Sequence, residues 1–463
     1  MVWSFLVATS TAAAAAEPLL ASVAKADITP KPGLPMWGYS GRTAGAEGTL
    51  DPLMAKCLVL KSPREAVAIV TLDLGRVPEE TVLEDARQRI HAECGISNLF
   101  VTASHTHQAP SLESIGGVPN EYGQSVGAAI AKIVVQAADQ LVPVKIGVAQ
   151  GEADLGHNRR RLLPDGRVAM QWRNAERDPT APVDRQFTVI RVDREDGTSL
   201  AVLYHYACHP VVLGADNLRY SADYVGQAAA VVEAGLDTTC LFLQGACGDI
   251  NPYVDKTPLV HGGVEEMRKM GTELGQLVEQ TARNTKTALV TEPALRFHQQ
   301  SIPLKVRWDL QNPDARAVLS RAYGRRFDQY LAPRLEGGIV SAPLAVLLIG
   351  DDVALVGMPG EVFVQFQLDL KARSLVPHTL LVGYTNGYHA YFPTIRDAAA
   401  GGYGGKTATY VEVGAGERLL NQGLVTIYRL TDRLHDLPRE EDFRLIEWDE
   451  IKPRKADTKA ASP

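Results

Sequence analysis

The sequence has few cysteines, no surplus of positive charge and no long apolar run beyond its N-terminus. Its five cysteines form no CxxC pair, which excludes a disulfide-rich scaffold and a zinc site built from thiolates. A formal net charge of −7 leaves no basic surplus to neutralise phosphates, so nucleic acid is not an expected partner. No internal apolar stretch reaches the roughly 18 residues of a membrane span, so no transmembrane span is expected.

The composition that remains is that of a large globular protein. Of 463 residues, 45% are hydrophobic and 22% are charged, which argues against disorder and fibrous folds. The first 18 residues resemble a secretory signal peptide, because an apolar stretch leads into small residues and Ala14-Ala15-Ala16 offers a cleavage site. No Lys or Arg precedes that stretch, and a disordered alanine-rich leader is the alternative. The pattern favours an exported protein, either periplasmic or secreted.

Short apolar runs alternate with longer helical patterns, which predicts an α/β fold. Strands are expected at residues 66–72, 98–103, 186–192, 200–206, 239–243, 344–349, 353–356 and 379–383, and helices at 78–92, 126–141, 225–234 and 263–287. No linker interrupts residues 24–436, so we expect one large catalytic domain with mixed β-sheets flanked by helices. The last 27 residues, 437–463, read as a charged tail.

The most informative motif is Ser104-His105-Thr106-His107, directly after the predicted strand 98–103. In an extended chain, residues two apart point to the same side, so the imidazoles of His105 and His107 can reach the same position in space. Ligand-binding groups in open α/β sheets gather at the C-terminal ends of strands. The pair therefore favours a metal ion or an acid/base pair over two structural histidines.

Other polar residues follow predicted strands in the same way. They are Asp73, His209, Asp249, Glu361, Tyr384, Asn386, Tyr388 and Tyr391. Each alone is typical of a turn or a helix cap. Together, two histidines and a glutamate from several strand ends have the composition of a zinc site that keeps one position open for water.

Competing motifs lack the structural context that they need. Gly123-Gln124-Ser125-Val126-Gly127 matches the G-x-S-x-G pattern of serine hydrolases, but a loop precedes it where a nucleophile elbow needs a strand. Ser125 is therefore expected near the start of a helix. Gly405-Lys406-Thr407 resembles the end of a phosphate-binding loop, but Ala400 occupies the first glycine position and no strand leads into it.

Several motifs in fixed order carry a family resemblance over about residues 24–436. They are Asp27-Ile28-Thr29-Pro30, Trp37-Gly38-Tyr39, residues 51–60, Asp73-Leu74-Gly75, the His-Thr-His motif, Asn158-Arg159, His209-Pro210, residues 248–252, Pro359-Gly360-Glu361, Asn386-x-Tyr388-x-x-Tyr391 and Tyr403. In these the chain resembles the catalytic domain of the neutral/alkaline ceramidase family, zinc-dependent amidases that hydrolyse N-acylsphingosine.

The resemblance implies a set of site residues. The implied Zn²⁺ ligands are His105, His209, Glu361 and Tyr391, and the implied neighbours of the substrate amide are His107, Arg159 and Tyr403. The twelve-residue spacing to Tyr403 favours Tyr391 over Tyr388. Asp73, Asp223 and Asp249 are candidates to orient the ligating histidines or, equally, to serve as turn and cap carboxylates.

Departures from the family pattern lie near the implied substrate site. Asn251 stands where the family has a serine, so a serine nucleophile is unavailable there, and the Asn251 amide remains only as a weak candidate donor to a developing oxyanion. Residues 108–111 and Gly404 also differ. The expected function is an exported zinc-dependent amidase acting on a small-molecule or lipid-like N-acyl substrate. The alternatives are a zinc hydrolase of another amide or ester, and a non-catalytic exported metal-binding protein. The oligomeric state is not predicted.

Overall fold

The computed structural model describes residues 17–113, 120–290 and 294–446. All but the last two residues of the predicted leader lie outside this range, as does the end of the predicted tail from residue 447. No helix in the described ranges combines the length and apolar character needed to cross a membrane.

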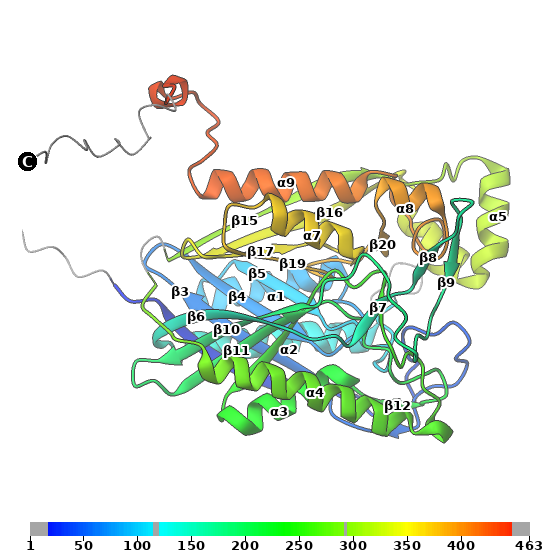
Figure 1. Cartoon of the computed structure of the whole chain (residues 1–463), viewed down its shortest axis with the longest axis horizontal. Coiled ribbons are helices and arrows are strands. Elements are labelled where there is room, and N and C mark those ends of the chain that lie inside the picture. Colours follow the sequence, from blue (N-terminus) through cyan, green and yellow to red (C-terminus); the bar gives the residue numbers. More distant parts are fainter. Residues whose placement is uncertain (1–16, 114–119, 291–293, 447–463) are drawn as a thin grey trace, which may run out of the picture.

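Two β-sheets stack at the centre of the described chain (Figure 1). The larger sheet has eight strands in the order β13-β11-β10-β6-β1-β3-β4-β5, and only its two edge pairs, β13–β11 and β4–β5, are parallel. Its strands span β1 Leu20–Asp27, β3 Met54–Lys61, β4 Ala66–Leu72, β5 Asn98–Ala103, β6 Val142–Glu152, β10 Gln186–Arg194, β11 Ser199–Tyr206 and β13 Thr239–Gln244. The smaller sheet runs β15-β16-β17-β19, with bounds Leu295–Lys305, Ile339–Ile349, Val353–Gly357 and His378–Val382.

Helices cover the outer faces of both sheets, so the molecule has four layers (Figure 1). On the larger sheet, α1 (Glu80–Cys94) and α2 (Glu121–Ala138) pack together on one half, and α3 (Tyr224–Leu236) and α4 (Gly263–Asn284) on the other. On the smaller sheet lie α7 (Val364–Arg373) and α9 (Ala415–Leu430). The helices α5 (Pro313–Tyr323) and α6 (Ala332–Leu335) connect β15 to β16, and α8 (Ile395–Ala400) follows β20 (Tyr391–Phe392).

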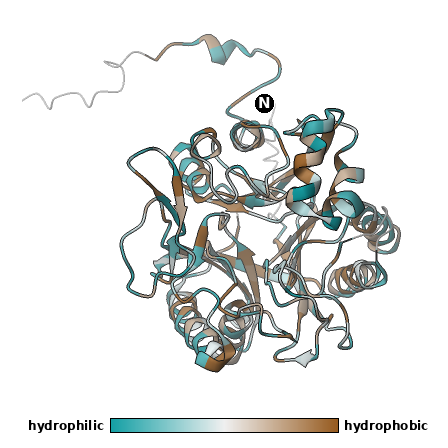
Figure 2. Cartoon of the chain, turned by 90° about the vertical axis from the view of Figure 1, so that its right-hand side faces the viewer, coloured by the Kyte–Doolittle hydropathy of each residue, from teal (hydrophilic) through white to brown (hydrophobic). Residues whose placement is uncertain are grey.

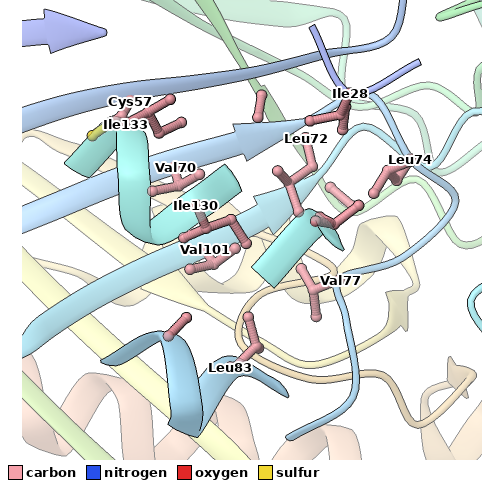
Figure 3. Packing of buried hydrophobic residues seen from close by; sticks show 14 of the residues in the cluster. Ile28, Cys57, Val70, Leu72, Leu74, Val77, Leu83, Val101, Ile130 and Ile133 are labelled. Atoms are coloured by element: carbon pink, nitrogen blue, oxygen red, sulfur yellow. The ribbon is translucent and has the colours of Figure 1, made fainter. Parts of the chain in front are cut away.

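Burial on both faces explains why strands such as β4 are largely apolar. In β4, Val67 and Ile69 point into the cluster between the two sheets, whereas Val70 and Leu72 belong to the cluster under α1 and α2. Figure 3 shows the second cluster, in which Ile130 of α2 lies close to Val70. Side chains alternate between the two faces of a strand, so a strand buried on both sides is largely apolar, and Thr71 is the one polar residue of β4.

The predicted α/β class, with mixed sheets flanked by helices, is confirmed, and the strands at 66–72 and 98–103 are found with the bounds predicted. The helix predicted at 126–141 instead spans Glu121–Ala138, because Asn120 caps it by accepting a hydrogen bond from the backbone N–H of Gly123 (2.6 Å). Ser125 lies inside this helix and donates to the carbonyl of Tyr122 (2.7 Å). The strand–turn–helix geometry of a nucleophile elbow is therefore absent at Ser125.

The strands that carry the predicted site residues end at one edge of the two sheets. The Gln244 side chain, at the end of β13, donates to the carbonyls of Ser104 (2.8 Å) and Cys208 (3.1 Å), which follow β5 and β11. The backbone N–H of Gly383, which follows β19 of the smaller sheet, donates to the carbonyl of Gln244 (2.9 Å). Figure 2 shows the molecule from the side on which β7, β8 and β20 lie in Figure 1, with helices at the periphery and strands and loops at the centre.

A buried histidine joins the two sheets and makes stability depend on pH. His205 of β11 is fully buried, and its Nε2 lies 2.8 Å from the carbonyl of Leu381 in β19. Burial is the main cause that lowers the pKa of His205 from 6.5 to about 4. The unfolded chain therefore takes up a proton at His205 between these values while the folded chain does not, and folding stability falls as the pH drops through this window.

Replacing His205 with Gln is expected to weaken this acid sensitivity. The amide can still donate to Leu381 but cannot titrate. We compare the unfolding free energy of the variant with that of the original protein. When the pH is lowered from about 8 to about 4, this difference should change by about 3 kcal/mol in favour of the variant, at 1.36 kcal/mol per pKa unit. Urea unfolding at both pH values measures the difference. A constant difference between the two proteins would show that His205 does not titrate in this way.

Candidate metal centre

Two imidazoles and one carboxylate meet at the edge of the sheets where the strands β5, β11, β13 and β19 end. The Nε2 atoms of His105 and His209 lie 3.3 and 3.2 Å from the same atom, Oε2 of Glu361. All three side chains are buried, with residue exposures of 1, 1 and 4%. The His107 Nε2 lies 3.3 Å from the Nε2 of His105, and the ligand atoms of the three histidines fall within 4.8 Å of one another. This is a donor cluster of the size that one metal ion needs.

The local backbone that brings the histidines together is not the extended chain expected from the sequence. His105 has a φ of 67°, in the left-handed region that a non-glycine residue adopts only at a cost. Its backbone N–H donates to the carbonyl of Leu74 (2.9 Å) and so ties the segment to the turn after β4. That turn includes Gly75, where a Cβ atom would lie 2.0 Å from the indole ring of Trp37. The imidazoles of His105 and His107 do lie close together, as predicted, but a strained turn orients them and not an extended chain.

Backbone carbonyls hold both candidate ligand rings. The Nδ1 of His105 lies 2.6 Å from the carbonyl of Gly75, and the Nδ1 of His209 lies 3.1 Å from that of Ile250. A carbonyl oxygen only accepts hydrogen bonds, so each Nδ1 carries the proton and each Nε2 keeps its lone pair. Both lone pairs are on the atoms that face Glu361. The donor set therefore has the chemistry that a divalent metal such as zinc requires.

The alternative that aspartates orient these rings is wrong. The Asp73 carboxylate accepts from the backbone N–H of Met54 (3.0 Å). Asp223 caps α3 by accepting from the N–H of Tyr224 (2.7 Å). Asp249 accepts from the Asn158 side chain (2.7 Å) and from a backbone N–H (2.8 Å). Asp223 is thus a cap carboxylate, and Asp73 and Asp249 bind groups of other segments that are not the ligating histidines.

The electrostatics suit a cation at this point. His105 and His209 hold the pKa of Glu361 well below its usual value, against the opposing effect of burial. Burial is the main cause that lowers the pKa of His209 to about 4, and burial followed by the neighbouring His105 lowers that of His107 well below its ordinary value. At neutral pH the site thus presents the Glu361 carboxylate and the neutral imidazoles of His209 and His107, the forms that bind metals.

Two tyrosines reach Glu361. Tyr391 is directly opposite Glu361 in the parallel pair of β18 (Glu361–Val362) and β20, and its buried hydroxyl accepts a hydrogen bond from Nη2 of Arg159 (3.0 Å). Tyr388 donates its hydroxyl hydrogen to Oε1 of Glu361 (2.6 Å). The geometry brings both candidates of the sequence analysis to the cluster, with Tyr391 as the one that also contacts Arg159.

Arg159, Tyr403 and Asn251 lie on the same side as Tyr391. The Arg159 guanidinium is 5.4 Å from the centre of the Tyr403 ring, which is itself 5.3 Å from that of Tyr391. Nη1 of Arg159 donates to Oδ1 of Asn251 (2.9 Å) and Nη2 donates to the carbonyl of Gly248 (2.7 Å). Asn251 thus turns its amide oxygen towards Arg159, which makes it a support for that guanidinium.

A pocket of about 240 Å³ opens onto the cluster. His105, His107, Glu361, Tyr391 and Tyr403 line it. Sequence reasoning had placed Ser111 near the substrate site but missed several other lining residues, among them Ser40, Glu113, Arg326 and Tyr410. Arg326 comes from the segment that connects α5 to α6, and its Nε donates to Glu113 (2.8 Å) across the pocket lining. No local motif marks these residues, because they meet only in the folded chain.

The four-layer α/β fold and its buried cluster of imidazole and carboxylate groups, open to a pocket, define a candidate metal-dependent enzyme. The chain belongs to the neutral/alkaline non-lysosomal ceramidase family, whose N-terminal sequence model matches residues 20–272. This range contains His105, His107, Arg159, His209 and Asn251. The resemblance seen in the sequence motifs is therefore confirmed, and membership supports an amide hydrolase rather than a non-catalytic metal-binding protein.

Two solved structures share the fold. A neutral ceramidase from Pseudomonas aeruginosa is 18% identical with a TM-score of 0.72, over 90% of this chain and 75% of that one. A structure described as ceramidase complexed with C2 has the same identity and TM-score, over 91% and 76% of the two chains. The similarity extends well beyond the range of the family model.

Proposed function

We propose that the protein is an exported zinc-dependent hydrolase that cleaves an N-acyl amide bond. His105, His209, Glu361 and Tyr391 are the proposed ligands, within a catalytic unit of about residues 24–436. The observation that carries the proposal is the convergence of two Nε2 lone pairs on one oxygen of Glu361, at 3.3 and 3.2 Å. Three protein ligands or more beside a pocket are typical of catalytic zinc, whereas structural zinc sites are closed.

Zinc at this position would polarise the amide carbonyl and lower the pKa of a water molecule to about 7. The protein's own groups have separate tasks. Arg159 and Tyr403 would donate hydrogen bonds to the oxygen on which negative charge develops. His107 would carry a proton to the leaving nitrogen, since it lines the pocket and its Nδ1 has no hydrogen-bond partner. Asn251 would keep Arg159 in place.

A polar N-acyl substrate is a second candidate beside ceramide itself. The pocket lining includes the Glu113–Arg326 ion pair (2.5 Å) and the hydroxyls of Ser40 and Ser111. An alkyl chain placed against these groups would displace their water without replacing its hydrogen bonds. The lining thus favours a hydroxylated or otherwise polar amide over a lipid with two alkyl chains. Comparing a short-chain ceramide with an N-acetylated amino sugar in one assay separates the two.

Removing the metal is expected to abolish hydrolysis of whichever amide is cleaved. After dialysis against a chelator, the rate should fall by about 100-fold or more, and one equivalent of Zn²⁺ should restore it. Elemental analysis and amide hydrolysis are measured on the same samples. Hydrolysis at full rate by protein free of metal would refute the proposal.

A further inference from the structure

A buried chain of polar groups lies behind Arg159. Arg159 is only 3% exposed, and its hydrogen bonds go to a carbonyl, to the Tyr391 hydroxyl and to the Asn251 amide. None of these partners is a carboxylate, which is unusual for a buried guanidinium because an uncompensated buried charge is costly. Its Nε is buried with no partner. The carboxylates that compensate Arg159 therefore act without touching it, and Glu361 is one of them.

Asn251 connects Arg159 to a carboxylate. Arg159 only donates hydrogen bonds, so it fixes Oδ1 of Asn251 on its own side and leaves Nδ2 facing away. Nδ2 donates to Oδ2 of Asp255 (2.9 Å). Asn251 and Asp255 are 0 and 2% exposed, so water does not compete for either bond. The result is a continuous path from Asp255 through Asn251 and Arg159 to the Tyr391 hydroxyl.

The backbone gives this path a rigid frame. Asn251 lies in β14 (Ile250–Pro252), which pairs antiparallel with β7 (Gly156–Asn158), and Arg159 follows β7 directly. The backbone N–H of Arg159 donates to the carbonyl of Asp249 (2.9 Å). One two-stranded ribbon therefore carries Asn251 and positions Arg159, and the remaining freedom is that of the long arginine side chain.

We propose that Asp255 is a positioning residue, which through Asn251 holds the Arg159 guanidinium against Tyr391. This inference rests on the proposed function, in which Arg159 stabilises the developing oxyanion. A side chain with several rotatable bonds contributes fully only when its position is fixed in advance. Asp255 supplies a fixed acceptor for Asn251 and adds its carboxylate to the acidic surroundings of Arg159, of which Glu361 is also a part.

Asp255 has one other partner, which provides a matched control. Lys256 donates to Oδ2 of Asp255 (2.5 Å), and its ammonium lies 4.7 Å from the centre of the Trp172 ring. If Asp255 served only to neutralise Lys256 or to shape its loop, removing either partner would have the same effect. If Asp255 acts through Asn251, only changes at Asp255 disturb Arg159.

Asp255→Ala, Lys256→Met and Arg159→Met, with the double variant Asp255→Ala/Arg159→Met, test the proposal in the zinc-loaded full chain. Asp255→Ala removes the acceptor of Asn251 and is expected to lower kcat about 10- to 100-fold with little change in KM and unchanged zinc content, because a displacement of about 1 Å costs that much. Lys256→Met should stay within about twofold of the original rate, and in the Arg159→Met background Asp255→Ala should have almost no further effect.

Equal losses in Asp255→Ala and Lys256→Met, or additive losses in the double variant, would overturn the positioning role. A crystal structure of zinc-loaded Asp255→Ala tests the role independently of activity, and it should show the Arg159 guanidinium displaced from Tyr391. An unmoved guanidinium would also overturn it. If the original protein cleaves no amide, the proposed function fails, and the crystal structure still decides whether Asp255 positions Arg159.

Discussion

Replacing Glu361 with Gln is expected to remove the bound metal and to lower the rate of amide hydrolysis by about 10³-fold. A metal supplies several kcal/mol of transition-state stabilisation, and each 1.36 kcal/mol changes the rate by a factor of ten. The side chain keeps its shape but loses the charge on which His105 and His209 converge at 3.3 and 3.2 Å. An amide group facing two Nε2 lone pairs cannot replace a carboxylate as a metal ligand. Elemental analysis and hydrolysis of the cleaved substrate measure both effects.

Glu113→Gln is the matched control, because Glu113 also lines the pocket but pairs with Arg326. It should keep a full equivalent of zinc, whatever it does to KM. Zinc content and turnover that survive in Glu361→Gln would show that the metal, if any, is bound elsewhere.

Two neighbouring strands of the larger sheet were predicted with the bounds that the structure has. They are β4 and β5, and each is a short run of mainly apolar residues, in which Thr71 and Thr102 are the polar interior positions. β15 (Leu295–Lys305) was not predicted. It is an edge strand of mixed burial, and the polar segment His298–Ser301 interrupts its apolar pattern. Its pairing with β16, which defines it as a strand, is a property of the folded chain. The helix α9 was not predicted either, although its sequence has the apolar periodicity of a helix, with Leu420, Leu424 and Ile427 at helical spacing.

The candidate site also has features that the sequence predicts and features that it does not predict. The types of its donors, two histidines and a glutamate after strand ends, follow from the sequence, because imidazole and carboxylate are ordinary metal ligands. The groups that orient the rings do not, because a backbone carbonyl such as that of Gly75 or Ile250 belongs to every residue type. Asp255 was missed for a related reason: its link to Arg159 passes through Asn251, whose role is fixed only by both neighbours.

The three histidines of the cluster differ in what their second ring nitrogen contacts. His105 and His209 each have Nδ1 near a carbonyl, which fixes the ring and directs the Nε2 lone pair inwards. His107 has no partner for Nδ1, and its residue is less buried than the other two. A ligand gains from a fixed ring, whereas a group that accepts and releases protons needs a nitrogen that is free to change its partner. This difference is our reason for placing His107 outside the ligand set.

His107→Gln tests that assignment, and His205→Gln is its matched control as another histidine, fully buried, between the two sheets. The His107 variant should retain one equivalent of zinc while its kcat falls by about 10²- to 10⁴-fold, the usual contribution of a proton carrier. The His205 variant should retain both zinc and activity near neutral pH. Since the Nε2 of His107 lies 3.3 Å from that of His105, a ligand role would instead make zinc content fall together with kcat, and that result would move His107 into the metal-binding set.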